Sequence, residues 1–363
     1  MENWLKRFEL SPKDAPNDGI LFADHSPKGR SGHMGHALVE YGKGKILAFY
    51  PNCSAIDPRY KGHSGDGWME YRRSIDGGRT WSEPIVEPHS KALHEAQCGR
   101  TMMCEKAVCT EDGGIVLFYL TCDMRTNGHI WEPYFEPYYA FSTDGGETWS
   151  ELHLFVHEAG RIYDVLYRDG VMYALFYANA ELPGVAHERD HDYRLYVSED
   201  GGKKWELRSV LPFQSTMHCY YGTMEFMPDG RLIAYIYDEK DEYNLKYLVS
   251  EDGGRTWGVN RRAFFEKKIR NPQLVYFDGT WFMHGRSGSF GKDRGHFVLY
   301  SSQDGVNWDA GQYLRMATAG AGAYSNNLVV HLPEGENRLL IQTSHAYEGN
   351  KTNTIMWWID YRK

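Results

Sequence analysis

Short runs of apolar residues alternate with turn sequences along most of the chain. In the first unit of this pattern, the runs 36–41, 46–50 and 68–72 are separated by a turn at 42–45 and by a longer loop. In later units the first two runs flank an Asp-Gly dipeptide, as at Asp169-Gly170. A two-residue Asp-Gly turn between apolar runs is the strongest short signal for a β-hairpin. The pattern therefore predicts antiparallel strands throughout and no amphipathic helix of note.

An eight-residue turn motif recurs between these units. Its fullest form is Ser250-Glu-Asp-Gly-Gly-Arg-Thr-Trp257, and nearly the same residues occur at Ser74–Trp81, Ser142–Trp149 and Ser198–Trp205. A degenerate copy spans Ser301–Trp308, with Gln303 at the position of the aspartate. The Ser and Asp side chains can bond local backbone N–H groups, glycine supplies positive φ, and the indole is a large apolar anchor. The motif is therefore interpreted as a structural turn.

The spacing of the motif indicates the architecture. The serines that open the five copies lie 68, 56, 52 and 51 residues apart, which is close to one blade of a β-propeller. We predict an all-β fold, a six-bladed β-propeller of four-stranded antiparallel blades, as a single domain over residues 1–363. The sixth unit lacks an outer strand. An apolar run within 19–24 is expected to supply it and close the ring, with 1–18 as an N-terminal extension.

Composition excludes several classes of partner. The chain has 363 residues, with 40 basic and 49 acidic side chains and no basic run, which argues against nucleic acid and against an anionic membrane surface. The 26 tyrosines and 11 tryptophans suit stacking on sugar faces. The six cysteines form no CxxC pair and are expected to be reduced thiols in the core. We expect no cofactor and no metal, and a cytoplasmic location because no signal peptide is visible.

The centre of the ring is the expected place for a functional site. In a propeller the innermost strand of each blade lines the central channel, and long loops after the second strands, such as 52–67, 122–137, 179–192 and 285–295, lie at the same end. If the inner strands packed only against each other, small apolar residues would be expected where these strands begin. Polar, aromatic and cationic residues at those positions therefore indicate a pocket. At the inner-strand starts we find Arg30, His33, His36, Gln97, Arg100, Arg161, Tyr163, His218, Tyr220, Tyr221, Arg270, Asn271, Tyr324, Ser325 and Asn326.

The turn motifs, known as Asp boxes, the six units and the phrases at 37–41 and 322–326 resemble the sialidase (neuraminidase) superfamily from about residue 20 onward. In that family a glutamate activates a tyrosine nucleophile, an aspartate is the acid/base, and three arginines hold the substrate carboxylate. The resemblance implies that Tyr324 is the tyrosine and Glu225 the glutamate. It implies further that Asp57 or Asp66 is the aspartate and that Arg286 or Arg270 is the last arginine.

Two family arginines are replaced in this chain. His33-Met-Gly-His36 stands where the first is expected, and Tyr237 where the second is expected. Neither histidine nor tyrosine reproduces bidentate arginine contact with a carboxylate. His33 or His36 could instead be a general acid or base, since the ordinary histidine pKa is about 6.5. On a strand the two side chains would point to opposite faces, which disfavours a shared metal.

Three functions follow from these residues. The leading interpretation is a carbohydrate-active enzyme that cleaves a terminal glycosidic bond, with an acidic sugar as substrate. The second is a lyase acting at a uronic acid, such as rhamnose-glucuronate, in which a histidine and a tyrosine transfer the proton and an arginine neutralises the carboxylate. The third is a sugar-binding propeller without catalysis. The catalytic candidates are His33, His36, Asp57, Tyr221, Glu225 and Tyr324, and the substrate-binding candidates are Arg30, Arg100, Arg161, His218, Arg270, Asn271, Arg286 and Asn326.

Overall fold

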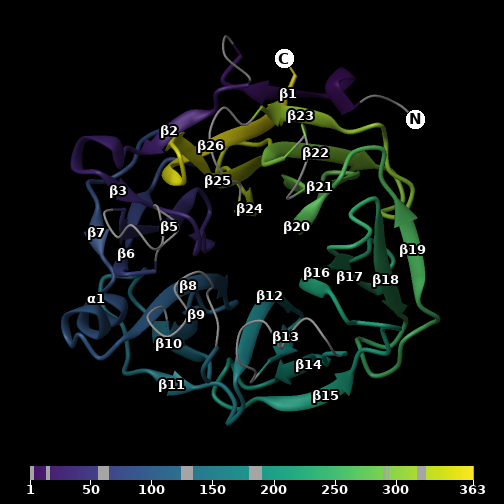
Figure 1. Cartoon of the computed structure of the whole chain (residues 1–363), viewed down its shortest axis with the longest axis horizontal. Coiled ribbons are helices and arrows are strands. Elements are labelled where there is room, and N and C mark those ends of the chain that lie inside the picture. Colours follow the sequence, from purple (N-terminus) through teal and green to yellow (C-terminus); the bar gives the residue numbers. More distant parts are fainter. Residues whose placement is uncertain are drawn as a thin grey trace.

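Six antiparallel sheets stand around a central axis in the computed structural model, so the predicted six-bladed β-propeller is confirmed (Figure 1). The structure describes residues 4–13, 17–55, 65–123, 134–179, 190–288, 292, 294–316 and 324–362. Asp57 lies outside the described residues. Colours in Figure 1 run once around the ring in chain order, so each blade packs against its sequence neighbours.

Each blade is built from one predicted unit, and the blades are numbered here in chain order. Blade 1 contains β3 (Arg30–Ser31), β4 (Leu38–Gly42), β5 (Lys45–Ser54), β6 (Gly67–Ser74) and β7 (Ile85–Val86). Blade 2 contains β8 (Arg100–Cys109), β9 (Ile115–Asp123), β10 (Tyr138–Ser142) and β11 (His153–Leu154), and blade 3 contains β12 (Gly160–Arg168), β13 (Val171–Ala178), β14 (Tyr193–Ser198) and β15 (Glu206–Val210).

The remaining blades follow the same order. Blade 4 contains β16 (Cys219–Phe226), β17 (Leu232–Asp238), β18 (Asn244–Ser250) and β19 (Arg261–Phe264), and blade 5 contains β20 (Arg270–Phe277), β21 (Thr280–Ser287), β22 (His296–Ser302) and β23 (Gln312–Arg315). Blade 6 contains β24 (Ser325–Val330), β25 (Arg338–Glu348) and β26 (Lys351–Tyr361), completed by β1 (Phe8–Ser11) and β2 (Ile20–Ala23).

Two N-terminal strands close the ring on β26. The apolar run within 19–24 forms β2, in which Ile20 pairs with Met356. The segment 1–18, expected to be an extension, also contributes β1, which pairs with the last four residues of β26. Phe8 of β1 is fully buried against Phe277 of blade 5. Pairing of both chain ends in one sheet removes the open edge that a linear array of blades would leave.

Small helical segments lie outside the blades. They are α1 (Pro88–Glu95) and the single 3-10 turns η1 (Trp4–Lys6) and η2 (Ser26–Lys28). The sequence pattern did not predict α1, which is only eight residues long and is capped by Glu87. The buried Glu87 carboxylate accepts from two helix N–H groups and from the Tyr119 hydroxyl of blade 2. No helix in the described part of the chain is long and apolar enough to cross a membrane.

The six cysteines are free thiols, as the sequence predicted. Four are buried, whereas Cys109 is half-buried and Cys98 is exposed. The prediction that the cysteines pack in the core is therefore correct for four of the six.

The Asp boxes connect the third and fourth strands of their blades, away from the axis. Ser250 donates to Asp252 at 2.8 Å, and Asp252 accepts from the backbone N–H groups of Arg255 and Thr256 and from the Thr256 hydroxyl. The box tryptophans pack between blades, as Trp205 does against Phe118 with ring centroids 5.6 Å apart. The boxes therefore stabilise the ring and do not form the central site.

The fifth box has a different register from the one predicted. Ser302 donates to Asp304 at 3.0 Å, and Asp304 accepts from the N–H groups of Val306 and Asn307. Asp304, not Gln303, therefore has the role of the box aspartate. The copy begins at Ser302 and is one residue shorter than the others, and this deletion hid the aspartate when the copies were aligned from Ser301.

Lys106 joins the inner strands of four blades across the axis. Its ammonium donates to Gln273 of β20 at 2.6 Å and to Asn326 of β24 at 2.8 Å, and it forms an ion pair with Asp164 of β12 at 3.0 Å. Asp164 also accepts from the Thr223 hydroxyl of β16. The side chains of Lys106 and Asp164 are only 12% and 7% exposed. This buried network fixes how the inner strands sit relative to one another.

We expect the Asp252→Asn variant to lose stability in a pH-dependent way. Hydrogen bonds, chiefly from the Thr256 N–H, lower the pKa of Asp252 from 3.8 to about 2. Because the folded-state pKa is depressed, this stabilisation is present above the unfolded pKa and is lost as the pH falls through the folded one. The difference in unfolding free energy between wild type and variant should shrink between pH 4 and pH 2 in urea titrations. A constant difference would contradict this origin.

We expect Lys106→Met to lower the free energy of unfolding by about 3–5 kcal/mol, because it leaves the Asp164 carboxylate buried without its cation. The matched control is Lys204→Met. Lys204 pairs with Glu206 at the surface, where the side chains are 72% and 66% exposed, and its loss should change the free energy of unfolding little. Urea denaturation measures both, and equal effects would show that the central pair contributes no more than a surface pair.

Candidate functional site

The inner strands of blades 2 to 5 each carry a β-bulge near the central axis. On β8, β12 and β16 the pairing with the second strand skips one residue, and the skipped residues are Glu105, Tyr163 and Tyr221. On β20 the two residues Asn271 and Pro272 stand opposite Gly285. A bulge turns a side chain out of the regular alternation of a strand. Four neighbouring strands therefore present extra side chains toward the axis.

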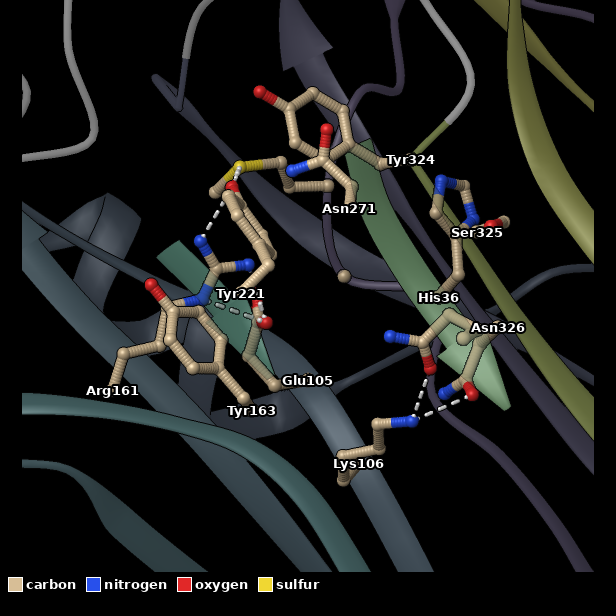
Figure 2. Close-up of a pocket in the computed structure, with 13 residues that line it drawn as sticks. His36, Glu105, Lys106, Arg161, Tyr163, Tyr221, Asn271, Tyr324, Ser325 and Asn326 are labelled. Carbon is tan, nitrogen blue, oxygen red and sulfur yellow. Dashed lines mark hydrogen bonds and ion pairs between the residues drawn. The ribbon is translucent and has the colours of Figure 1, made fainter. Parts of the chain in front are cut away.

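These side chains meet in one cavity, where Figure 2 shows them pointing toward one another. The cavity measures about 30 Å³, whereas whole small-molecule sites measure about 300 Å³ or more. It therefore has the size of a polar group or one or two water molecules rather than of a sugar ring. Its lining consists of Met34, Gly35, His36, Glu105, Lys106, Arg161, Tyr163, Tyr221, Asn271, Gln273, Tyr324, Ser325 and Asn326.

Arg161 links an acid and a phenol on the wall of the cavity. Its Nη2 and Nε donate to Glu105 Oε2 at 2.6 and 3.1 Å, and its Nη1 donates to the Tyr221 hydroxyl at 2.8 Å. The arginine is 3% exposed. Burial raises the pKa of Tyr221 well above its ordinary value, although the guanidinium acts in the opposite direction. The Tyr221 hydroxyl is therefore protonated at neutral pH.

Tyr324 and Arg286 stand side by side near this wall. The guanidinium carbon of Arg286 lies 5.1 Å from the Tyr324 ring centre, and the Tyr324 and Tyr221 rings are 5.9 Å apart. Arg286 is 8% exposed, forms no ion pair with another described residue, and has a buried Nε without a hydrogen-bond partner. Neighbouring Arg270 differs, because it pairs with Glu242 and donates to the Tyr237 hydroxyl.

Asn271 has a buried amide without partners. It lies in the β20 bulge at φ 53° and is 3% exposed. Neither its Nδ2 nor its Oδ1 has a hydrogen-bond partner among the described residues, and the same holds for Glu105 Oε1. Buried polar atoms in folded proteins are nearly always hydrogen-bonded. Unpaired donors and acceptors on the lining of one cavity indicate that a polar group, either water or part of a ligand, can be bound there.

His33 and His36 lie between β3 and β4, where the chain forms no strand. His36 contacts the His33 carbonyl at 3.2 Å and Gln342 at 3.3 Å, and His33 contacts the Asn350 carbonyl. Burial lowers the pKa of His33 to about 4 and that of His36 to about 3. Both are therefore neutral and weakly basic at pH 7, which opposes the acid/base role expected from the ordinary histidine pKa. No metal-binding group of His, Cys, Asp and Glu occurs among the described residues.

Several other predicted site residues do not line the cavity. Glu225 lies at the turn end of β16, where desolvation raises its pKa to about 8. Arg30 donates to Asn52, and Arg100 lies over the Phe135 ring, while His218 is 3.8 Å from Glu239. Asp66, the alternative to Asp57, contacts His94 at 3.4 Å with its side chain 55% exposed. The described contacts therefore do not place Glu225 beside Tyr324.

Glu105, Lys106 and Gln273 line the cavity but are not among the residues predicted from the sequence. The predicted residues lie at the start of each inner strand, whereas these three lie three to six residues further along. A signal was present in the two adjacent charges of Cys104-Glu-Lys-Ala107 inside an otherwise apolar strand. Adjacent residues of a regular strand point to opposite faces, so two neighbouring charges both facing the axis require a bulge.

Comparisons with known proteins agree with this architecture. A model of the BNR repeat-like domain matches residues 163–351, and one of the BNR/Asp-box repeat matches 140–151. No curated protein matches the sequence.

Among solved structures, a protein of unknown function from Dyadobacter fermentans is 13% identical, with a TM-score of 0.69 over 95% of this chain and 98% of that one. A mutant of the NanB sialidase from Streptococcus pneumoniae is 12% identical, with a TM-score of 0.65 over 94% and 70%. The α-L-arabinanase of Penicillium chrysogenum is 13% identical, with a TM-score of 0.58 over 94% and 97%.

At these identities the structural likeness concerns the fold, and it joins the Asp boxes and the six blades in pointing to the sialidase superfamily. The BNR repeat-like model covers more than half of the chain. This protein therefore belongs to the BNR repeat-like domain family, and its propeller is of the sialidase-superfamily type.

Proposed function

We propose that this protein is a glycoside hydrolase that binds an acidic sugar at the central cavity. The observation that carries the proposal is the set of bulged inner strands, which turn polar side chains into one cavity and leave the Asn271 amide and Glu105 Oε1 without partners. Sialidases and an arabinanase share this propeller fold, which supports a sugar substrate.

The charge around the cavity favours an acidic substrate. Two cations on the cavity lining already have a carboxylate partner: Lys106 pairs with Asp164, and Arg161 pairs with Glu105. Arg286 adds a buried positive charge that forms no ion pair in the described chain, and it shares the influence of one carboxylate, Glu242, with Arg270 and Lys268. A buried cation is costly unless a counter-charge is supplied. A ligand carboxylate beside Tyr324 would supply that charge, and a guanidinium is well shaped to bind it.

The unpaired atoms of the lining suit sugar hydroxyls. The Asn271 amide has one acceptor and one donor group to offer, and Glu105 Oε1 is an acceptor. A hydroxyl both donates and accepts, so adjacent hydroxyls of a sugar can satisfy all of these atoms. Because the cavity has the size of a polar group, we infer that substituents of the sugar enter it while the ring lies at its mouth.

Two tyrosine hydroxyls are the best placed groups for bond cleavage. Hydrolysis by a pair of free carboxylates has little support here, since among the described residues only Glu105 offers a carboxylate on the lining, and it is held by Arg161. Tyr221 and Tyr324 both line the cavity, and a tyrosine nucleophile is an established exception to the two-carboxylate scheme. Elimination is less favoured, because the histidines that would take the proton have pKa values of about 4 and 3.

We expect Arg286→Gln to lower kcat/KM for an acidic glycoside about 10- to 100-fold, which corresponds to the loss of a charged hydrogen bond. Cleavage of a neutral glycoside should change little. The assay compares sialosides, uronides and arabinosides in labelled water, where hydrolysis places solvent oxygen in the product. The matched control is Arg231→Gln, whose guanidinium pairs with Asp229 at the turn end of blade 4.

Three outcomes would contradict the proposal. An equal loss of kcat/KM on acidic and neutral substrates would show that Arg286 does not bind the substrate carboxylate. An unsaturated product without solvent oxygen would indicate elimination. Sugar binding without turnover, and unchanged in Asn271→Ala, would indicate a binding propeller with its site elsewhere.

A further inference from the structure

The hydroxyl of Tyr221 is oriented by a fixed donor and still has a proton to give. The tyrosine sits in the β16 bulge with φ 38°, and one lone pair of its oxygen is occupied by Arg161 Nη1 at 2.8 Å. Among the described residues its hydroxyl donates only to the sulfur of Met34, with 3.9 Å between oxygen and sulfur. Thioether sulfur is a weak acceptor. The proton is therefore available to a ligand in the cavity.

Burial does most to keep that proton on the oxygen, and two opposite charges nearby add to or oppose its effect. The Arg161 guanidinium alone favours the phenolate, and the Glu105 carboxylate on the far side of Arg161 favours the phenol. The other titratable side chains that face Tyr221 within the described chain are the phenols of Tyr163, Tyr237 and Tyr324. Arg286 lies beyond Tyr324. Glu105 is thus the one carboxylate among these neighbours that balances Arg161.

We propose that the buried Tyr221 hydroxyl is the proton donor to the leaving glycosidic oxygen, and that Glu105, acting through Arg161, directs it into the cavity and opposes its ionisation. This role rests on the proposed function. Tyr221 is then a catalytic residue, because it touches the reacting oxygen, and Glu105 is a positioning residue.

The proton and electrons of this step balance without a cofactor. The bond between the anomeric carbon and the leaving oxygen breaks, and its electron pair passes to that oxygen, which takes the Tyr221 proton. The phenolate that forms is stabilised by the N–H of Arg161. Water then adds its oxygen to the anomeric carbon, and its released proton returns to Tyr221.

The first test needs no substrate. The full chain is labelled with fluorotyrosine, and the fluorine resonance that disappears in Tyr221→Phe is assigned to Tyr221. In Glu105→Gln, which keeps the shape but removes the charge, this resonance should titrate at lower pH than in the wild-type protein. Tyr193→Phe is the control, since Tyr193 is a buried phenol outside the cavity lining, and it should leave the Tyr221 titration unchanged.

The second test is the pH profile of turnover on the glycoside that is cleaved best. Activity requires protonated Tyr221, so the basic limb of kcat should move to lower pH in Glu105→Gln. Tyr221→Phe should lose about 100-fold or more of kcat, as expected for a lost proton donor. A purely structural role of Glu105 would lower activity at all pH values and leave the limb in place.

The outcomes separate this proposal from the proposed function. An unshifted Tyr221 resonance overturns the role of Glu105, and a shifted resonance with an unmoved basic limb overturns the role of Tyr221 as donor. Absence of turnover on every glycoside overturns the proposed function, whatever the resonance does. If Glu105→Gln does not fold, the double variant Glu105→Gln/Arg161→Gln replaces it. Its Tyr221 resonance should titrate at higher pH than wild type, because Arg161 influences Tyr221 more strongly than Glu105 does.

Discussion

Closure of the ring is the constraint on which the rest of this structure depends. β26 accepts β1 and β2 as neighbours, so the two ends of the chain are held in one sheet. Once the ring is closed, the inner strand of every blade must face the axis, whatever its residues are. Buried polar side chains on those strands need partners, which adjacent blades, strands across the axis, water or a ligand can supply. Closure therefore gives the central residues their energetic importance.

The bulges explain how a narrow channel holds both a structural network and a free site. On β8 the bulge lets Glu105 and its neighbour Lys106 both face the axis. The carboxylate then meets Arg161, while the ammonium meets Asp164, Gln273 and Asn326. In a regular strand one of these two charges would point into the packing between blades. The one extra residue of this bulge therefore allows Lys106 to connect the inner strands and Glu105 to form part of the polar cavity lining.

The repeat and the Asp-Gly turns were sufficient to predict the fold, because turn chemistry and apolar runs are local properties that the ring only assembles. Reading the strand starts also found Arg161, Tyr221, Asn271 and Tyr324, all of which line or border the cavity. Glu105 and Lys106 could not be found in this way, since a bulge changes which side of a strand a residue faces. The depressed histidine pKa values were beyond reach as well, because burial of a loop depends on packing from distant blades.

Charge pairing distinguishes the structural part of the centre from the functional part. Lys106, Arg161 and Arg270 each have a carboxylate within ion-pair distance, and each pair joins different strands or blades. In each of these pairs the two charges compensate each other, so no ligand is needed to stabilise them. Arg286 and Asn271 are buried to a similar degree but lack such partners within the described chain. Burying these two groups without partners lowers the stability of the folded protein, because a buried polar group that makes no hydrogen bond or ion pair loses its hydration without compensation. A polar, anionic molecule would satisfy both groups, and this is why the proposed site is placed at Arg286 and Asn271 rather than at the aspartates of the boxes.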